Sequence, residues 1–449
     1  MEAFRQRIFE AQIAASSLAV YRNIIKDPIV KAFTEVLDLS LKDASVLDLI
    51  SKYHDFYSRL VEKSESCLEP AIGDIWKNHL LDLILADENS FSLQCEKTGI
   101  DGVGHDLTIL VQRDLTWLRK LYDFDFSAFV SYIKQSFVEA FVDLPEMYAV
   151  NRNAAFPYPE SYFREKYRVK QWMDNSLQWN RDIEVLAKFY RENGCGMFAR
   201  FWAFKWVNGE SDGELIGISR PDPITLNDLI GYEEQKQQVL RNTRQFVLGF
   251  GANNMLLYGD RGTGKSSTIK ALVHEFGDQG LRMVEVTKDQ LMNLPHIIAK
   301  FKGRPYRFII FVDDLSFEEH ETEYKFLKAV LEGSLEPAPE NVLIYATSNR
   351  RHLIREYHSD KAMDEARNMD TLQEKLSLAD RFGITVVYTS PDQEEYLNIV
   401  RGLAKSKGID MDEEQLQQLA LKWELWHNSR SGRTAKQFIE DLLGRLKST

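Results

Sequence analysis

The sequence predicts an α/β domain built on a parallel sheet, preceded by an all-helical domain and followed by a small helical lid. Three observations carry this prediction. A glycine-rich loop at residues 259–266 lies between an apolar run and a helical pattern. After residue 224, short apolar runs alternate with helical patterns, as is typical of a parallel sheet covered by helices on both faces. Before residue 195, apolar stripes with helical spacing follow one another.

Composition and charge set the limits of this interpretation. The chain has 449 residues, of which 44% are hydrophobic, enough for two or three domains with sizeable cores. The formal net charge of -12 does not favour non-specific binding to nucleic acid. The three cysteines form no CxxC pair, which predicts buried thiols in a reducing setting. No apolar run approaches the ~20 residues of a membrane helix, and the N-terminus does not resemble a signal peptide. We therefore expect a soluble, cytoplasmic protein.

Residues 1–195 are expected to form a helical domain. Asp27 and Pro28 make a good helix start, and Asp43 is expected to head another helix. The prolines in residues 143–160 predict a loop between two helical groups. The histidines of this half lack the spacing of metal ligands. They are His54, His79 and His105. The sequence does not indicate what this domain binds.

The pattern of apolar and polar residues changes near residue 200. Residues 201–218 predict a hairpin with a polar loop, and residues 220–223 predict an extended linker. We assign residues 196–223 to this hairpin and linker. The α/β domain is then expected at 224–390 and the helical lid at 391–449.

Five apolar runs are expected to be the strands of the parallel sheet. They occupy residues 254–258, 281–286, 308–312, 342–347 and 384–388. Each is followed by a polar loop or a helical pattern, for example the helix expected at 322–331. The apolar stripes after residue 391 predict the helices of the lid.

The loop after the first of these strands reads G-x-x-x-x-G-K-S and is followed by a helix, the order that a P-loop needs. Glycines let backbone N–H groups surround an anion, and the helix N-terminus adds unsatisfied donors. We expect Lys265 to bind the β- and γ-phosphates of ATP and Ser266 to reach Mg²⁺. The residues expected to bind the triphosphate are Gly259, Asp260, Arg261, Gly262, Thr263, Gly264, Lys265, Ser266 and Ser267.

A pair of acids at the end of a buried strand gives the second chemical signal. Asp313 and Asp314 follow the apolar run at 308–312. Carboxylates at such a position, next to a P-loop strand, can bind Mg²⁺ and orient an attacking water. We expect Asp313 to bind Mg²⁺ and Asp314 to polarise the attacking water.

Taken together, these motifs resemble an AAA+ ATPase. The resemblance implies that Ile230, Gly231 and Tyr232 line the adenine pocket. It also implies that Asn349, at the end of a strand, senses the γ-phosphate or the attacking water. By the same resemblance, Arg381 in Ala379-Asp380-Arg381-Phe382-Gly383 is an arginine finger, and Arg433 on the lid is a second sensor.

Three segments resemble more closely one bacterial AAA+ family, known as a domain of unknown function with ATP-binding motifs. They are residues 256–267, 313–317 and 346–353, and the likeness extends over about 195–449. It implies a cytoplasmic ATPase but no substrate. Asp314 departs from the wider AAA+ pattern, in which most members have glutamate, so the rate of hydrolysis stays open.

Several functions are compatible with these motifs. An arginine finger acts between subunits, which implies a homo-oligomer. The favoured function is remodelling of an unknown protein partner. The alternatives are a DNA-associated helicase loader or initiator and a slow nucleotide switch.

A DNA-associated function would need a local basic patch. Its candidates are Arg304, Arg307, Arg350, Arg351 and Arg355. A threading unfoldase is disfavoured, because residues 286–294 contain no aromatic-apolar-glycine loop.

Overall fold

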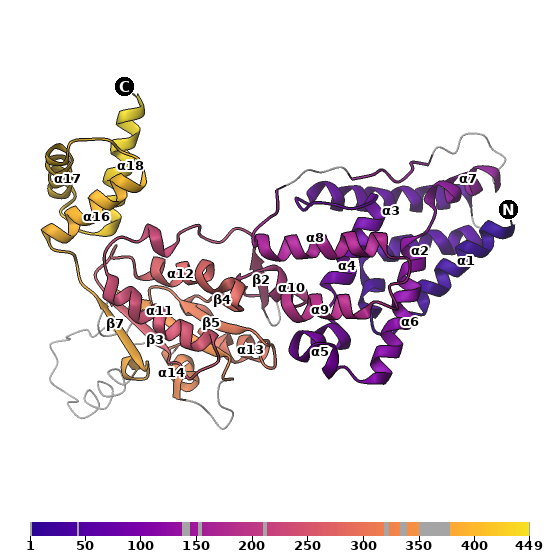
Figure 1. Ribbon diagram of the computed structural model, residues 1–449, viewed down its shortest axis with the longest axis horizontal. Coiled ribbons are helices and arrows are strands. Elements are labelled where there is room, and N and C mark those ends of the chain that lie inside the picture. Colours follow the sequence, from indigo (N-terminus) through magenta and orange to yellow (C-terminus); the bar gives the residue numbers. More distant parts are fainter. Residues whose placement is uncertain are drawn as a thin grey trace, which may run out of the picture. The chain divides into compact units, whose positions relative to one another are not determined.

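The computed structural model describes residues 2–42, 45–136, 144–150, 155–209, 213–317, 323–332, 339–349 and 378–448 (Figure 1). The chain forms two compact units, Met1–Phe201 and Trp202–Thr449. In the part of the chain that is described, none of the helices is both long enough and apolar enough to cross a membrane.

The first unit is helical in its described residues, as predicted (Figure 1). Its α-helices are α1 (Glu2–Ser16), α2 (Pro28–Leu41), α3 (Val46–Ser66), α4 (Ile75–Ala86), α5 (Ser90–Thr98), α6 (His105–Tyr122), α7 (Phe126–Ser136), α8 (Glu160–Asn175), α9 (Ile183–Asn193) and α10 (Gly196–Arg200). Short 3-10 turns lie at Arg22–Lys26 and Ile100–Gly102. No helix is present in 144–150 or 155–159, in agreement with the predicted loop. Asp43, the expected start of a helix, lies outside the described residues.

The start of α2 shows how the sequence sets a helix end. The Asp27 carboxylate accepts hydrogen bonds from the backbone N–H groups of Ile29 and Val30, and Pro28 occupies the first turn. This is the predicted cap. His79 on α4 also contacts Asp27, with 3.0 Å between Nε2 and Oδ1. The cap therefore joins α2 to α4 as well as starting α2.

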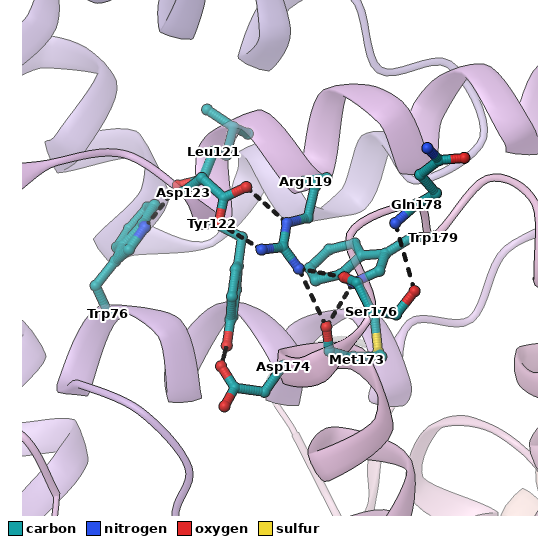
Figure 2. A network of polar contacts seen from close by, with 10 residues as sticks. All are labelled: Trp76, Arg119, Leu121, Tyr122, Asp123, Met173, Asp174, Ser176, Gln178 and Trp179. Atoms are coloured by element: carbon teal, nitrogen blue, oxygen red, sulfur yellow. Dashed lines mark hydrogen bonds and ion pairs between the residues drawn. The ribbon is translucent and has the colours of Figure 1, made fainter.

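Arg119 connects the end of α6 to the segment that follows α8 (Figure 2). Its guanidinium pairs with Asp123 through two N–H groups and donates to the backbone carbonyl of Ser176. It also faces the rings of Tyr122 and Trp179, at 5.1 and 5.3 Å from the centroids. One planar cation thus satisfies a carboxylate, a carbonyl and two aromatic faces, a combination that lysine cannot reproduce.

A cluster of buried charges lies between α4 and α8. Asp82 contacts the ammonium groups of Lys166 and Lys170 at 2.6 and 2.5 Å, and Glu69 also contacts Lys166 at 2.6 Å. Burial alone would raise the pKa of Asp82, but the two lysines outweigh burial and lower that pKa. The resulting stabilisation is present above the pKa of an unfolded aspartate and is lost as the pH falls through the lower folded value.

The second unit contains a sheet of seven described strands in the order β2-β1-β4-β5-β6-β3-β7. The strands are β1 (Ala203–Val207), β2 (Glu214–Ile218), β3 (Met255–Gly259), β4 (Leu281–Glu285), β5 (Arg307–Val312), β6 (Val342–Ser348) and β7 (Ile384–Tyr388). All neighbours pair in parallel except β1 and β2, which are antiparallel. The five predicted strands are β3 to β7, so the predicted α/β fold is confirmed. Strands β4, β5 and β6 are buried almost throughout, as expected for a sheet covered on both faces.

The predicted hairpin is present as β1 and β2, and it belongs to the sheet of the α/β domain, which was expected to start only at residue 224. Strand β1 pairs in parallel with β4, with Phe204 beside Val284. The side chains of Phe204 and Trp206 are buried. Without this hairpin, β4 would be an edge strand with unpaired backbone groups, so the hairpin extends the sheet and covers that edge. The boundary between the compact units accordingly falls at Phe201 and Trp202.

The helices of the second unit follow the predicted alternation. Among the described residues, the α-helices are α11 (Glu233–Val247), α12 (Lys265–Phe276), α13 (Leu294–Ala299), α14 (Tyr324–Glu332), α16 (Gln393–Ser406), α17 (Glu413–His427) and α18 (Gly432–Ser448). The last three form the lid and share one apolar core. Tyr396, Leu416 and Phe438, one from each helix, are buried there.

We predict that Asp82→Asn strongly destabilises the first unit. The substitution leaves two buried lysines without their shared carboxylate, which costs about 3–5 kcal/mol for a buried ion pair. Native-state hydrogen exchange of the α4 and α8 amides in the full chain would measure this loss. Glu160→Gln is the control, because Glu160 pairs with Arg164 on an exposed helix face. It should change stability by less than about 0.5 kcal/mol. Equal effects of both substitutions would contradict the prediction.

Candidate functional site

The glycine loop connects the end of β3 to the start of α12. Gly259, Gly262 and Gly264 have φ values of 139°, 77° and 92°, which favour glycine over other residues. A Cβ atom on Gly259 would lie 1.8 Å from the carbonyl oxygen of Tyr388 on β7. Because β7 is the neighbour of β3, the loop can leave the sheet along this path only with glycine at position 259.

Lys265 is buried at the first turn of α12. Its ammonium donates to the carbonyl oxygens of Gly259 and Asp260 at 2.9 and 2.7 Å and to Oδ1 of Asn349 at 3.1 Å. Burial lowers the pKa of Lys265, and the nearby Arg433 acts in the same direction, against the attraction of neighbouring carboxylates. An anion at this loop would therefore gain a poorly solvated cation as its partner.

Asp313 follows β5 and lies beside the start of α12. Its Oδ1 atom accepts hydrogen bonds from the hydroxyls of Ser266 and Thr347, both at 2.6 Å. Hydroxyl and carboxylate oxygens side by side are the kind of ligand that Mg²⁺ prefers. Among the described residues, no group of three or more His, Cys, Asp or Glu side chains could hold a metal. A metal here would thus need further oxygen ligands from a nucleotide or water.

Asp314 has a left-handed backbone, with φ at 49°. Its N–H donates to the Thr347 hydroxyl at 2.9 Å, and its carboxylate accepts from the amide of Asn349 at 2.6 Å. Left-handed conformations are uncommon for residues other than glycine and often occur at functional sites. The two contacts from the end of β6 hold this conformation.

Thr347 was not among the predicted site residues, although it contacts both acids. Strands β5 and β6 are parallel neighbours, with Val312 beside Ala346. The residues that follow these two positions therefore meet at the same edge of the sheet. The hydroxyl of Thr347, directly after Ala346, was the signal that could have identified it.

The lid contacts the glycine loop directly. The N–H of Arg433 donates to the carbonyl oxygen of Gly262 at 3.1 Å. A Cβ atom on Gly262 would come within 2.8 Å of the Ser431 hydroxyl, so the lid approaches the loop closely only because residue 262 is glycine. The predicted second sensor, Arg433, thus lies beside the predicted phosphate loop.

A pocket of about 1000 Å³ lies over these groups, within the second unit. Such a volume is at the upper end of the range for small-molecule sites. Its lining includes Ile230, Gly231, Tyr232, Arg261, Gly262, Thr263, Gly264, Lys265, Ser266, Ser267, Asp313, Asp314, Thr347, Asn349, Ile399, Leu403, Lys407, Arg433, Lys436 and Ile439. The segment predicted to receive adenine therefore lines the same pocket as the glycine loop, together with apolar side chains of the lid.

Tyr232 is fixed at one side of this pocket. Its backbone is left-handed, with φ at 57°. Its ring lies against that of Tyr388, with centroids 5.2 Å apart, and its hydroxyl donates to the carbonyl of Thr389 at 2.8 Å. The segment that precedes α11 is thereby tied to the end of β7.

Asp260 helps to hold the conformation of the glycine loop. Its carboxylate accepts from the N–H and the hydroxyl of Ser390, both at 2.7 Å. These hydrogen bonds lower the pKa of Asp260. Neither Asp260 nor Gly259 is among the residues that line the pocket. Ser390 was not predicted, because nothing in the local pattern pairs it with a residue so distant in sequence.

Arg381 lies apart from the other predicted site residues. It precedes β7, whereas the glycine loop and the acids follow the carboxyl ends of their strands. A strand of five residues is about 16 Å long at ~3.3 Å per residue. Arg381 therefore lies at the amino-terminal ends of the parallel strands, opposite to the carboxyl ends where the glycine loop and the acids lie. It does not line the pocket, and it pairs with Glu332 at 3.0 Å.

The described part of the predicted basic patch consists of two arginines that are engaged elsewhere. Arg304 faces the ring of Tyr306 at 5.9 Å. Arg307 faces the ring of Phe246 at 5.5 Å and donates to the carbonyl of Glu340. Arg350, Arg351 and Arg355 lie outside the described residues.

Comparison with known proteins identifies one family. Residues 199–446 match the family described as "Protein of unknown function (DUF815)". No curated protein is similar to the chain in sequence. Among solved structures, a mutant of Thermotoga maritima RuvB is 16% identical, covers 50% of this chain and 68% of its own, and has a TM-score of 0.36. The Thermotoga maritima RuvB Holliday junction branch migration motor is 14% identical, covers 49% of this chain and 72% of its own, and has a TM-score of 0.31. These values describe a distant and partial similarity.

We predict that Gly259→Ala disrupts the loop far more than Gly280→Ala. Both glycines have positive φ, but only at position 259 would a Cβ atom meet a backbone carbonyl. Gly280→Ala should cost about 1–2 kcal/mol of backbone strain. Gly259→Ala should cost more and separate β3 from β7. Hydrogen exchange of the β3 and β7 amides would measure the difference, and equal exchange in both variants would refute the steric argument.

Proposed function

The chain belongs to the DUF815 family, and we propose that this member is an AAA+ ATPase that hydrolyses ATP and uses the energy to remodel a protein partner. One observation supports this proposal above the others. Under a nucleotide-sized pocket, hydrogen bonds run without interruption from Ser266 through Asp313, Thr347, Asp314 and Asn349 to Lys265. This series of hydrogen bonds joins the glycine loop to both acids.

The residues of the loop suit a triphosphate. Backbone N–H groups of the glycine loop and of the first turn of α12 supply donors for phosphate oxygens, and the helix dipole favours negative charge there. Lys265 would exchange carbonyl partners for the phosphates, a stronger partner for an ammonium group. The apolar side of the pocket, with Ile230 and Tyr232, would receive the adenine ring.

Ser266 and Asp313 would hold Mg²⁺, which when bound would neutralise charge on the phosphate oxygens. Asp314 would accept a hydrogen bond from the attacking water and so raise its nucleophilicity. Asn349 would keep the Asp314 carboxylate oriented towards that water. An aspartate reaches about one methylene less far than a glutamate, so the distance between water and carboxylate would limit the rate.

The proposal includes assembly into a homo-oligomer. Arg381 lies at the edge of the sheet opposite to its own pocket, which favours action on ATP bound by a neighbouring copy. Contact between Arg433 on the lid and the glycine loop would let the lid respond to the loss of phosphate. The helical first unit would then transmit this movement to the unknown protein client. A cytoplasmic location is part of the same proposal.

The other two functions lead to different measurements. A slow nucleotide switch would bind ATP with little release of phosphate, so a phosphate-release assay separates it from an ATPase. A DNA-associated ATPase would bind single-stranded DNA with an affinity that falls steeply with salt. The net charge of -12 and the engaged Arg304 and Arg307 do not favour that function.

We predict that Lys265→Ala weakens ATP binding by ~10–100-fold or more, the effect of losing a charged hydrogen-bond donor. Equilibrium dialysis with ATP and Mg²⁺ would measure the affinity. Lys270→Ala is the control, because Lys270 lies on the same helix and does not line the pocket. If both variants bind ATP like the wild type, the nucleotide site is not at this loop.

We predict that Asp314→Asn retains ATP binding but lowers kcat by ~10²–10⁴-fold, the usual contribution of a general base. The amide keeps the size of the side chain and removes the charge that polarises water. Phosphate release at saturating ATP would measure kcat. Asp410→Asn, an exposed substitution on the lid, should behave like the wild type. Unchanged phosphate release from Asp314→Asn would exclude this role.

A further inference from the structure

Glu332 contacts the predicted arginine finger from the end of α14. The distance between Nη2 of Arg381 and Oε1 of Glu332 is 3.0 Å. Lys328, one turn earlier on the same helix, lies 3.8 Å from the same oxygen. The Arg381 side chain is 46% exposed, so it remains partly accessible to solvent while it contacts Glu332.

The backbone at Arg381 is held in place independently of this contact. The N–H of Phe382 donates to the carbonyl of Ala379, and the ring of Phe382 is buried. Two residues later, the N–H of Ile384 donates to the carbonyl of Asn254, at the start of the sheet pairing. The turn therefore fixes the Cα atom of Arg381, but the long side chain keeps several rotatable bonds. Among the described residues, Glu332 is the ion-pair partner that restrains them.

We propose that Glu332 is a positioning residue for Arg381. It holds the guanidinium at the amino-terminal edge of the sheet, in the orientation from which Arg381 reaches the γ-phosphate of ATP bound by the next copy of the chain. This inference rests on the proposed function, because it requires an ATPase in which Arg381 acts between subunits.

The chemistry of arginine makes such a double role possible. A guanidinium has five N–H donors in a rigid plane, and one of its nitrogens faces Glu332. The remaining donors can bind a phosphate while this contact is kept. Exposed ion pairs of this kind contribute little to stability, so the contact is better explained by orientation of Arg381 than by stabilisation of the fold.

Steady-state ATP hydrolysis by the full chain tests the proposal. Glu332→Ala should lower kcat about 10-fold, because a misplaced catalytic group costs rate even when it is present. KM for ATP should stay within about twofold, since Glu332 is not among the residues that line the pocket. Glu332→Gln keeps an oxygen that accepts from Arg381 and should restore most of kcat. Lys325→Ala, an exposed substitution on the same helix, should have no effect.

A double-mutant cycle gives the decisive comparison. Arg381→Ala alone should lower kcat by ~10³–10⁵-fold, the known contribution of an arginine finger. Adding Glu332→Ala to Arg381→Ala should cause no further loss, because Glu332 acts only through Arg381. Unchanged or increased kcat in Glu332→Ala would overturn the proposal. An equal loss in both backgrounds would also overturn it, since Glu332 would then act on its own.

Failure of this proposal can be told apart from failure of the proposed function. If the wild type releases no phosphate, or if Arg381→Ala keeps full activity, the ATPase mechanism between subunits is wrong and the role of Glu332 falls with it. If Arg381→Ala is inactive and Glu332→Ala is fully active, only the role of Glu332 is wrong. The thermal unfolding temperature of Glu332→Gln should equal that of the wild type, which separates orientation from loss of fold.

Discussion

Two side-chain hydroxyls that donate to Oδ1 of Asp313 make the contacts on which the rest of the site depends. One comes from Ser266 on α12 and the other from Thr347 at the end of β6. The Thr347 bond requires that β5 and β6 are parallel neighbours, and the Ser266 bond requires that β3 lies on the other side of β6. The strand order thus brings the glycine loop, the acids and Asn349 to one edge of the sheet. A different order would scatter the same residues.

Two residues of the site have unusual backbone conformations. Gly259 passes against the backbone of Tyr388, and Asp314 adopts a left-handed conformation that costs about 1–3 kcal/mol. Contacts with the sheet offset this cost, since the N–H of Leu315 donates to the carbonyl of Thr347 at 2.7 Å. The end of β6 therefore supports the strained backbone of Asp314, and the hydrogen bond from Asn349 orients its carboxylate.

The two units use polar groups in different ways. In the first unit, Asp82 and Arg119 are enclosed by cations, carbonyls and rings that belong to the same unit. These contacts specify how the helices pack and do not by themselves point to a ligand. In the second unit, Lys265 and Asp314 face a pocket. The groups that could act on a ligand therefore lie in the second unit.

Sequence patterns were enough to predict the glycine loop, the acid pair, the five central strands, the lid and the helical nature of the first unit. Each of these follows from local rules: apolar periodicity, the conformational freedom of glycine and the capping of helix ends. Four contacts became visible only in the folded chain: the β1–β2 hairpin extends the sheet, Thr347 joins both acids, Ser390 holds Asp260 and Glu332 pairs with Arg381. The positions joined by these contacts are 34 residues apart for Thr347 and Asp313 and 130 apart for Ser390 and Asp260. Such pairs depend on which strands become neighbours. The packing of the whole unit sets this, because the side-chain pattern of one strand does not specify which strand pairs with it.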